Sequence, residues 1–145
     1  MELKAFTDSD LTLYAELATK FLTSPACLGE PDYELFKRNF SHIIKENDCF
    51  GWFLVEEGNV CGYLLCSIMF STEVGGLQLW VEELSVDDVY RGKGLGTEAL
   101  SILMDKFPDV IRFRLEVTPS NRGAKKLYER LGFEFLGYEQ MILDQ

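Results

Sequence analysis

Hydrophobic residues in the first third of the chain recur every three or four positions, and this spacing predicts two amphipathic helices. The first runs from Leu11 to Phe21, directly after polar residues that are suited to N-capping. Proline and glycine interrupt the pattern between residues 25 and 31, and the second helix covers Tyr33 to Lys45. A short strand from Leu3 to Phe6 precedes both helices.

From residue 50 the hydrophobic period changes, and it becomes typical of β-strands. A hairpin turn at Glu57-Gly58-Asn59 and a second turn at residues 72–76 separate the first three of them. The elements expected after residue 50 are strands over Phe50–Glu56, Val60–Phe70 and Leu77–Val86, a helix ending near Lys106, a strand over Ile111–Val117, a helix over Asn121–Leu131 and a last strand over Phe133–Leu143. Ser120 is expected to cap the last helix, and Gly132 to follow its end.

The order β-α-α-β-β-β-α-β-α-β predicts an α+β fold, a single domain over residues 1–145 with a central mixed sheet. A right-handed crossover is expected to connect two parallel strands, which end at Val86 and Val117. The longest largely apolar stretch, Val60–Phe70, is shorter than the roughly 20 residues that span a bilayer. The start of the chain shows no signal peptide. We therefore expect a cytoplasmic protein with no membrane partner.

Charge is distributed unevenly along the chain, whose formal net charge is −10. Residues 1–90 hold 16 acidic and 5 basic side chains, whereas residues 91–130 hold 5 acidic and 9 basic ones. The overall acidity argues against a general nucleic-acid binder. A locally basic segment suits an anionic ligand, and the acidic remainder suits a cationic one, although acidity also serves solubility.

Metal-binding residue types are scarce. The four cysteines form no C-x-x-C pair, and His42 is the only histidine. A zinc site is therefore poorly supplied, and we expect no metal and reduced, mostly buried cysteines.

The clearest chemical motif is the glycine-rich stretch Arg91-Gly92-Lys93-Gly94-Leu95-Gly96-Thr97, between a strand and a helix. Glycines leave backbone N–H groups open to an anion, and the N-terminus of a helix adds further unpaired amides. A Walker nucleotide site is disfavoured because the lysine stands in the wrong place. A dinucleotide fingerprint is disfavoured because its last glycine is missing and only 29 residues follow Glu116.

Two motifs follow one another along the chain, Arg91-x-x-Gly94-x-Gly96 and then Asn121-x-x-Ala124-x-x-Leu127-Tyr128 with Gly132-Phe133. The first is similar to the Q/R-x-x-G-x-G/A signature of the Gcn5-related N-acetyltransferase (GNAT) superfamily, and the second resembles the second acetyl-CoA motif of that superfamily. The resemblance implies a mixed, mostly antiparallel sheet in which the two parallel strands that end at Val86 and Val117 separate, with four helices around it. It also implies acetyl-CoA as co-substrate.

The same resemblance implies positions for coenzyme A. The pantetheine arm would enter the gap between the two strands and bond the backbone of Leu84 and Val86. The pyrophosphate would lie on amides from Gly92 to Thr97, near Arg91. Asn121 and Ala124, at the start of the last helix, would contact the pantetheine or the sulfur end.

Acetyl transfer to an amine needs a base, oxyanion donors and an acid for the leaving thiolate. Tyr128 occupies the acid position of the family, and Glu82 matches the acidic residue of its polyamine- and aminoglycoside-type members, so we expect Glu82 to act as the base through water. Glu83 and Glu116 are substitutes or substrate contacts. Strand alternation is expected to place Glu82 and Glu83 on opposite faces.

The acidic helical region at residues 7–45 favours a small cationic amine as acceptor: a polyamine, an aminoglycoside or a lysine-like amine. Two other functions stay open, namely acetylation of protein lysines or N-termini, and a non-catalytic domain that binds or senses acyl-CoA. A homodimer is a further partner that the resemblance suggests.

Overall fold

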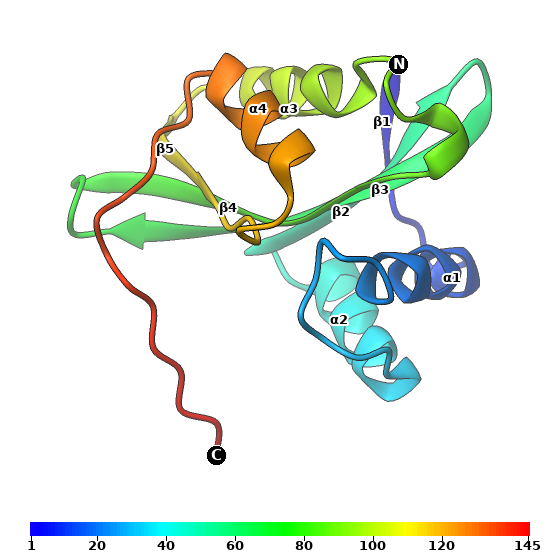
Figure 1. Cartoon of the computed structure of the whole chain (residues 1–145). Helices are drawn as coiled ribbons and strands as arrows, with labels where there is room; N and C mark the ends of the chain where they lie inside the picture. The colour runs from blue at the N-terminus through cyan, green and yellow to red at the C-terminus, as the bar shows by residue number, and fades with distance from the viewer.

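The computed structural model describes residues 1–145, in which a five-stranded sheet lies between two layers of helices (Figure 1). The order across the sheet follows the order along the chain, and all neighbours are antiparallel except the last pair, which is parallel. The strands are β1 (Glu2–Ala5), β2 (Cys49–Glu56), β3 (Asn59–Ser71), β4 (Gly76–Val86) and β5 (Val110–Leu115).

Helices cover both faces of this sheet. Figure 1 shows α1 and α2 on one face and α3 and α4 on the other. Their bounds are α1 (Leu11–Leu22), α2 (Tyr33–Lys45), α3 (Leu95–Lys106) and α4 (Arg122–Arg130), and a short 3₁₀ helix, η1 (Asp88–Tyr90), follows β4. None of these helices combines the length and the hydropathy that crossing a bilayer requires.

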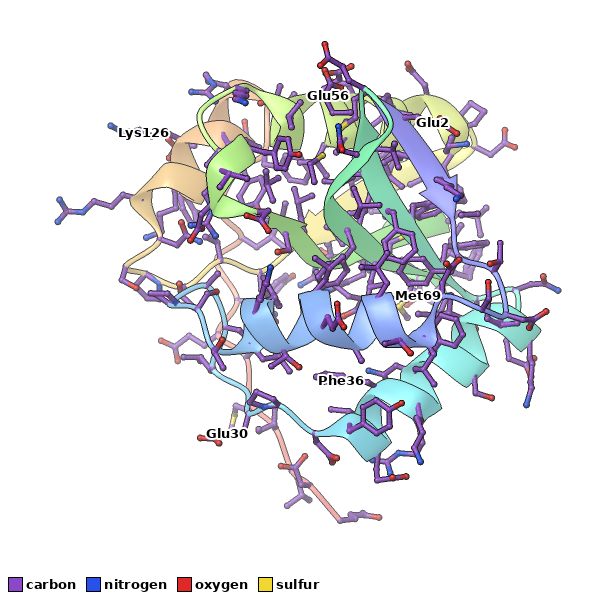
Figure 2. The ribbon with its side chains drawn as sticks, turned by 90° about the vertical axis from the view of Figure 1, so that its right-hand side faces the viewer. Glu2, Glu30, Phe36, Glu56, Met69 and Lys126 are labelled. Carbon is purple, nitrogen blue, oxygen red and sulfur yellow. The ribbon has the colours of Figure 1, made fainter.

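Two hydrophobic cores lie on the two faces of the sheet. Leu79 and Val81 of β4 pack with Leu100 of α3 in one of them. The other core is rich in aromatic residues, and its rings make tilted, stacked and edge-to-face contacts. Figure 2 shows Phe36 between α2 and α1, where its ring centroid lies 5.9 Å from that of Tyr14. These cores hold α1 and α2 against one face of the sheet and α3 against the other.

A β-bulge interrupts β4 near its end. Leu65 of β3 pairs with Glu83, but the next residue of β3, Cys66, pairs with Val81, so Glu82 is the extra residue. Pairing between β4 and β5 stops at Val81 and Leu115, whereas pairing with β3 continues to Val86. The end of β4 therefore has one free edge, as the predicted separation of the two parallel strands requires.

The α+β fold predicted from the sequence is confirmed, with its four helices and its parallel crossover. The predicted last strand over Phe133–Leu143 is wrong. Residues 134–145 make no backbone hydrogen bond, and Figure 1 shows the C-terminal segment running away from the sheet. The hydrophobic residues there do not alternate, since Leu136 follows Phe135 directly and a run of three apolar residues begins at Met141, so they form no single buried face.

The start of α4 also differs from the prediction. Asn121, and not Ser120, caps this helix, because the Asn121 side chain accepts a hydrogen bond of 3.1 Å from the backbone N–H of Ala124. Gly132 follows the helix with a φ of +87°, as predicted for its C-terminal end.

Candidate functional site

The loop between η1 and α3 presents six consecutive backbone N–H groups, from Gly92 to Thr97, that have no hydrogen-bond acceptor in the protein. The first backbone hydrogen bond at the start of α3 is donated by Glu98 to Gly94 O, at 3.0 Å. Unpaired amides together with the positive end of a helix dipole form an anion-binding site. The loop therefore has a geometry that suits a negatively charged group.

The three glycines of the loop serve two purposes. Gly92 and Gly94 adopt φ values of +76° and +83°, and no atom lies within 4 Å of the position that a side chain would occupy. These two keep the backbone open. At Gly96 an added Cβ would lie 2.9 Å from Leu127 of α4, so this glycine allows α4 to pack against α3.

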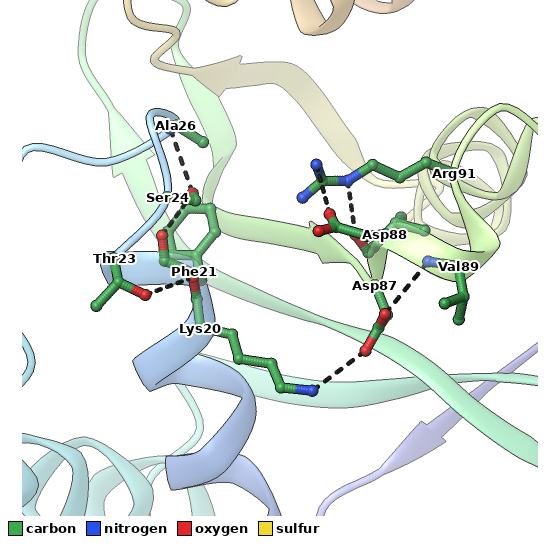
Figure 3. A network of polar contacts seen from close by, with 10 residues as sticks. Lys20, Phe21, Thr23, Ser24, Ala26, Asp87, Asp88, Val89 and Arg91 are labelled. Atoms are coloured by element: carbon green, nitrogen blue, oxygen red, sulfur yellow. Dashed lines mark hydrogen bonds and ion pairs between the residues drawn. The ribbon is translucent and has the colours of Figure 1, made fainter.

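Basic side chains surround the loop, but Arg91 is already engaged. Its Nε donates to Val86 O at 3.0 Å, and its Nη1 lies 2.6 Å from Asp88 Oδ1 (Figure 3). Lys93 lies over the ring of Tyr90, with its Nζ 5.2 Å from the centroid. The amides, and not these side chains, are the groups already aimed at an anion.

The free edge of β4 carries the backbone groups of Leu84 and Val86. Asp87 N–H donates to Cys61 O of β3 at 2.8 Å, and hydrogen-bonded pairs recur at every second residue of an antiparallel ladder. Ser85 therefore also points its polar groups toward β3, whereas Leu84 and Val86 point theirs toward the gap beside β5. The family resemblance implies the same two residues as backbone partners of the pantetheine arm.

A groove of about 410 Å³ lies between the C-terminal end of α1 and the end of β4. Lys20 of α1 bridges it, since its Nζ lies 3.3 Å from Asp87 Oδ2, as Figure 3 shows. Two hydrogen bonds to Asp87, from the backbone N–H of Val89 and from Lys20, hold the pKa of its carboxyl below the ordinary value. Ser85, Val86 and Arg91 also line the groove, so it joins the free edge of β4 to the glycine loop.

The bulge places two carboxylates on the same face of β4. Glu82 Oε1 accepts a hydrogen bond of 2.5 Å from Ser67 Oγ, and Glu83 Oε2 accepts one from the Tyr63 hydroxyl. Residues 63 and 67 are four apart on β3 and share a face, the one that α1 and α2 cover. The expectation that Glu82 and Glu83 lie on opposite faces is therefore wrong, because the extra residue of the bulge cancels the alternation.

These two carboxylates have different surroundings. Glu82 is exposed, whereas Glu83 is half-buried, and burial raises the pKa of the Glu83 carboxyl, with the charge of Glu82 acting in the same direction. Neither has a basic partner, since every ion pair of the protein involves other residues. The pair thus forms a negative centre that is not neutralised within the chain.

Glu116, the third candidate carboxylate, is exposed just after β5 and makes no hydrogen bond or ion pair. It lies on the other side of the gap from the Glu82–Glu83 pair. The structure gives it no partner that would position it for chemistry.

Tyr128 lies on the inner face of α4 and packs against the same core as Leu84 and Val86. Burial raises the pKa of its phenol, so the group stays protonated at neutral pH. Its ring contacts Phe133, with centroids 5.9 Å apart, while its hydroxyl makes no hydrogen bond in the protein. A protonated donor without a partner is what an acid role needs.

Asn121 and Ala124 meet in the cap of α4. The Asn121 side-chain oxygen is used by the Ala124 amide, which leaves the Asn121 side-chain NH₂ group free to donate elsewhere. On the outer side of this helix, Lys126 points into solvent in Figure 2, and Lys125 Nζ donates to Pro119 O at 2.9 Å.

Several residues of the site were missed by the sequence analysis. Tyr63 and Ser67 hold the two carboxylates, and Lys20 links α1 to β4. In the sequence, Tyr63 and Ser67 are recognisable only as strand residues. Their contacts with the two carboxylates depend on a bulge that no glycine or other turn residue marks. The alternation of residues 63, 65 and 67 on β3 was the one available signal of a shared face.

The chain matches the model of the acetyltransferase (GNAT) family over residues 12–133. Among curated proteins it is similar to the spermine/spermidine N(1)-acetyltransferase of Bacillus subtilis strain 168, with 28% identity over 89 residues. That match spans 58% of this chain and 59% of the relative, which is less than two thirds of the length of either.

Solved structures share the fold over nearly the whole chain. A probable acetyltransferase superposes with a TM-score of 0.83 at 18% identity, covering 100% of both chains. AAC(6′)-Iy, in complex with the bisubstrate analogue CoA-S-monomethyl-acetylneamine, has a TM-score of 0.80 at 15% identity and coverage of 99% and 97%. An integron cassette protein from the mobile metagenome of Cole Harbour Salt Marsh is 26% identical, with a TM-score of 0.77 and coverage of 99% and 88%.

Proposed function

Because this chain belongs to the GNAT acetyltransferase family, we propose that it transfers the acetyl group of acetyl-CoA to a primary amine of a small cationic molecule, with polyamines the first class to test. One observation carries the proposal: the six unpartnered amides of Gly92–Thr97 follow the end of β4, whose edge toward β5 is free after Val81. A diphosphate and an extended amide-bearing arm are the two halves of coenzyme A that such an arrangement suits.

In this proposal the cofactor is held mainly by backbone atoms. The amides of the loop receive the pyrophosphate, and the backbone groups of Leu84 and Val86 bond the pantetheine along the free edge of β4. Arg91 leaves Val86 O when the arm arrives and turns its guanidinium toward the phosphates. The free NH₂ group of Asn121 is a further donor to the arm.

The acceptor is proposed to bind on the opposite side, near α1 and α2. Glu82 and Glu83 supply adjacent negative charges that have no basic partner in the chain, and such a site attracts an ammonium group. The similarity to a spermine/spermidine N(1)-acetyltransferase supports the same class of acceptor. A neutral or anionic amine lacks this attraction.

Three groups of the chain are proposed to assist the reaction. Glu82, whose carboxylate is exposed, takes the proton of the ammonium through a water molecule and so frees the nitrogen lone pair. The Leu84 N–H donates to the oxygen of the thioester carbonyl as negative charge develops there. As the nitrogen–carbon bond forms and the carbon–sulfur bond breaks, the Tyr128 hydroxyl gives its proton to the departing sulfur, and the second proton that the nitrogen loses returns through water to the Tyr128 phenolate.

The proposal is tested by following release of free thiol from acetyl-CoA across a panel of about a dozen amines. The panel contains spermine, spermidine, an aminoglycoside, lysine, a peptide with a free N-terminus and a neutral amine. Calorimetry with coenzyme A on the same preparation measures binding separately from turnover.

We expect saturable binding of coenzyme A and thiol release that a cationic amine stimulates. Binding without stimulation by any amine would favour a domain that senses acyl-CoA, and turnover only with the peptide would favour a protein acetyltransferase. Absence of coenzyme A binding by folded protein would refute the proposal altogether.

A further inference from the structure

A second group of chemically reactive side chains lies at the junction of α2 and β2, outside the proposed active site. His42 Nε2 lies 2.7 Å from Asp48 Oδ1, and the ligand atoms of His42, Asp48 and Cys49 all lie within 4.8 Å of one another. The group combines an imidazole nitrogen, a carboxylate oxygen and a thiol sulfur. The transferase chemistry proposed above uses none of the three.

The backbone around this group is held at several points. His42 lies in the last turn of α2, and its carbonyl accepts from Glu46 N–H at 2.9 Å. The carbonyl of Asp48 accepts from Ile68 N–H at 2.7 Å, and Cys49 pairs with Ser67 in the sheet. Two of the three residues are thus anchored to β3 and the third to a helix, so their separation does not depend on a free loop.

The distances suit a small tetrahedral cation after side-chain adjustment. Two ligand atoms on one zinc ion are about 3.4–3.6 Å apart, given bonds of roughly 2.0–2.3 Å at tetrahedral angles. The His42–Asp48 distance of 2.7 Å must therefore open by less than 1 Å, and the thiol, which lies within 4.8 Å of both other ligand atoms, must approach by up to about 1.3 Å, changes that side-chain torsions can provide.

The chemistry of this donor set selects among metals. Calcium and magnesium prefer oxygen ligands alone, whereas a mixed nitrogen, sulfur and oxygen set is typical of zinc and its first-row neighbours. Three protein ligands leave the fourth position to water. The ionised carboxylate and thiolate together supply two negative charges, which balance the charge of a divalent ion.

The position of the group connects it to the active-site carboxylates. Ser67 pairs with Cys49 in the sheet and donates to Glu82 at 2.5 Å, so one residue separates the thiol from the proposed base. A cation at Cys49 would thus lie beside the acceptor side of the molecule.

We propose that His42, Asp48 and Cys49 form a zinc site, with His42 Nε2, Asp48 Oδ1 and Cys49 Sγ as its ligands. The expectation from the sequence was that no metal is bound, because one histidine and scattered cysteines supply no metal-binding motif. The fold brings the three together from a helix end and a strand start. This inference does not rest on the proposed transferase function.

The test uses untagged, reduced full-length protein with Zn²⁺ alone, measured by calorimetry, and with Co²⁺, measured by absorption. We expect one Zn²⁺ per chain and a thiolate-to-cobalt charge-transfer band. His42→Gln and Cys49→Ser each weaken zinc binding by about tenfold or more, and Cys49→Ser abolishes the band. Cys27→Ser is the matched control, because Cys27 is a free, partly exposed cysteine outside the His42–Asp48–Cys49 group, and it leaves both readouts unchanged.

Absence of Zn²⁺ binding by the wild-type protein would overturn the proposal, as would equal binding by the His42→Gln and wild-type proteins. His42 is 46% exposed at its side chain, so its substitution leaves the fold intact even where Cys49→Ser does not. A charge-transfer band that survives in Cys49→Ser but disappears in Cys27→Ser would place the cation elsewhere and also refute the site.

Discussion

The two sides of the candidate active site use different chemical groups of the protein, backbone groups on one side and side chains on the other. On the cofactor side, the loop after η1 and the free edge of β4 offer backbone N–H and C=O groups. On the acceptor side, the face of the sheet that α1 and α2 cover, the available groups are side chains. They are the carboxylates of Glu82 and Glu83, which accept hydrogen bonds from Ser67 and Tyr63. One side depends on main-chain shape and the other on which side chains a bulge brings together.

The two sides should therefore be sensitive to different kinds of substitution. A backbone site is damaged when a residue changes the path of the chain or fills the space above it. A side-chain site is damaged when one functional group is removed without any change in shape. Isosteric substitutions should therefore affect the acceptor side and leave binding of coenzyme A intact, whereas added Cβ atoms should do the reverse.

The largest effect is expected from Glu82→Gln, which removes the proposed base and keeps its size. We expect kcat/KM with the best amine to fall by about 10²–10⁴-fold, the usual contribution of a positioned base. Affinity for coenzyme A, measured by calorimetry, should not change. Steady-state thiol release from pH 6 to 9 provides the measurement.

Glu116→Gln is the matched control for this variant, because Glu116 is an exposed carboxylate with no partner, and it should change the rate less than twofold. A large loss of activity in Glu116→Gln, with Glu82→Gln near wild type, would mean that Glu116 and not Glu82 is the base. It would also move the acceptor chemistry to the β5 side of the gap.

Tyr128→Phe tests the point where the two sides meet. Loss of the hydroxyl is expected to lower kcat by about 10²-fold, because it removes the proposed acid for the thiolate, while stability hardly changes since this hydroxyl has no hydrogen bond in the protein. Tyr90→Phe keeps the ring under Lys93 and is the control. Equal rates for the two variants would mean that Tyr128 contributes only packing.

Gly94→Ala tests the backbone side with a single added Cβ. The residue has a φ of +83°, so alanine is strained there by about 1 kcal/mol, and its methyl group enters the space above the loop. We expect affinity for coenzyme A to fall by about tenfold, or roughly 1.4 kcal/mol. Calorimetry and thermal unfolding measure the two effects separately.

Gly58→Ala is matched to it in strain, since Gly58 has a φ of +79° in the turn between β2 and β3, with no atom near its added Cβ. Both variants should lose similar stability, but only Gly94→Ala should lose affinity. Equal affinities would show that the loop does not hold the ligand.

Features that depend on local sequence could be predicted, whereas features that depend on distant strands could not. The glycine loop, the turn at Gly58 and the helix over Tyr33–Lys45 were predicted correctly, because glycine and apolar spacing act locally. The edges of the other elements were displaced by one or two residues, as fraying helix and strand ends usually are.

Non-local features could not be predicted in this way. At the bulge, the neighbouring residues Leu65 and Cys66 of β3 pair with Glu83 and Val81, so Glu82 has no partner. The register of β4 thus depends on another strand, and the bulge reverses the face of every residue that follows. The strand expected over Phe133–Leu143 failed for a related reason: apolar residues are present, but no neighbouring strand pairs with them. Strand propensity alone does not supply a partner.

The smallest effect is expected in stability, from Glu83→Gln. Burial raises the pKa of this carboxyl above its unfolded value, so the folded state favours the protonated form. The associated stability is complete at acidic pH and is lost as pH rises through the folded-state pKa. A neutral glutamine avoids that loss and can still accept from the Tyr63 hydroxyl. We therefore expect Glu83→Gln to stabilise the protein by about 1 kcal/mol at pH 7.

Urea unfolding at pH 7 and pH 4 measures this difference, with Glu82→Gln as the exposed control that should show little change at either pH. The gain should vanish at pH 4, where the wild-type carboxyl is itself protonated. A gain of stability combined with weaker binding of the amine would mean that the buried charge is kept for the acceptor at the expense of the fold, a trade-off typical of functional sites. A loss of stability at pH 7 would instead make Glu83 a structural partner of Tyr63, and the acceptor side would then depend on Glu82 alone.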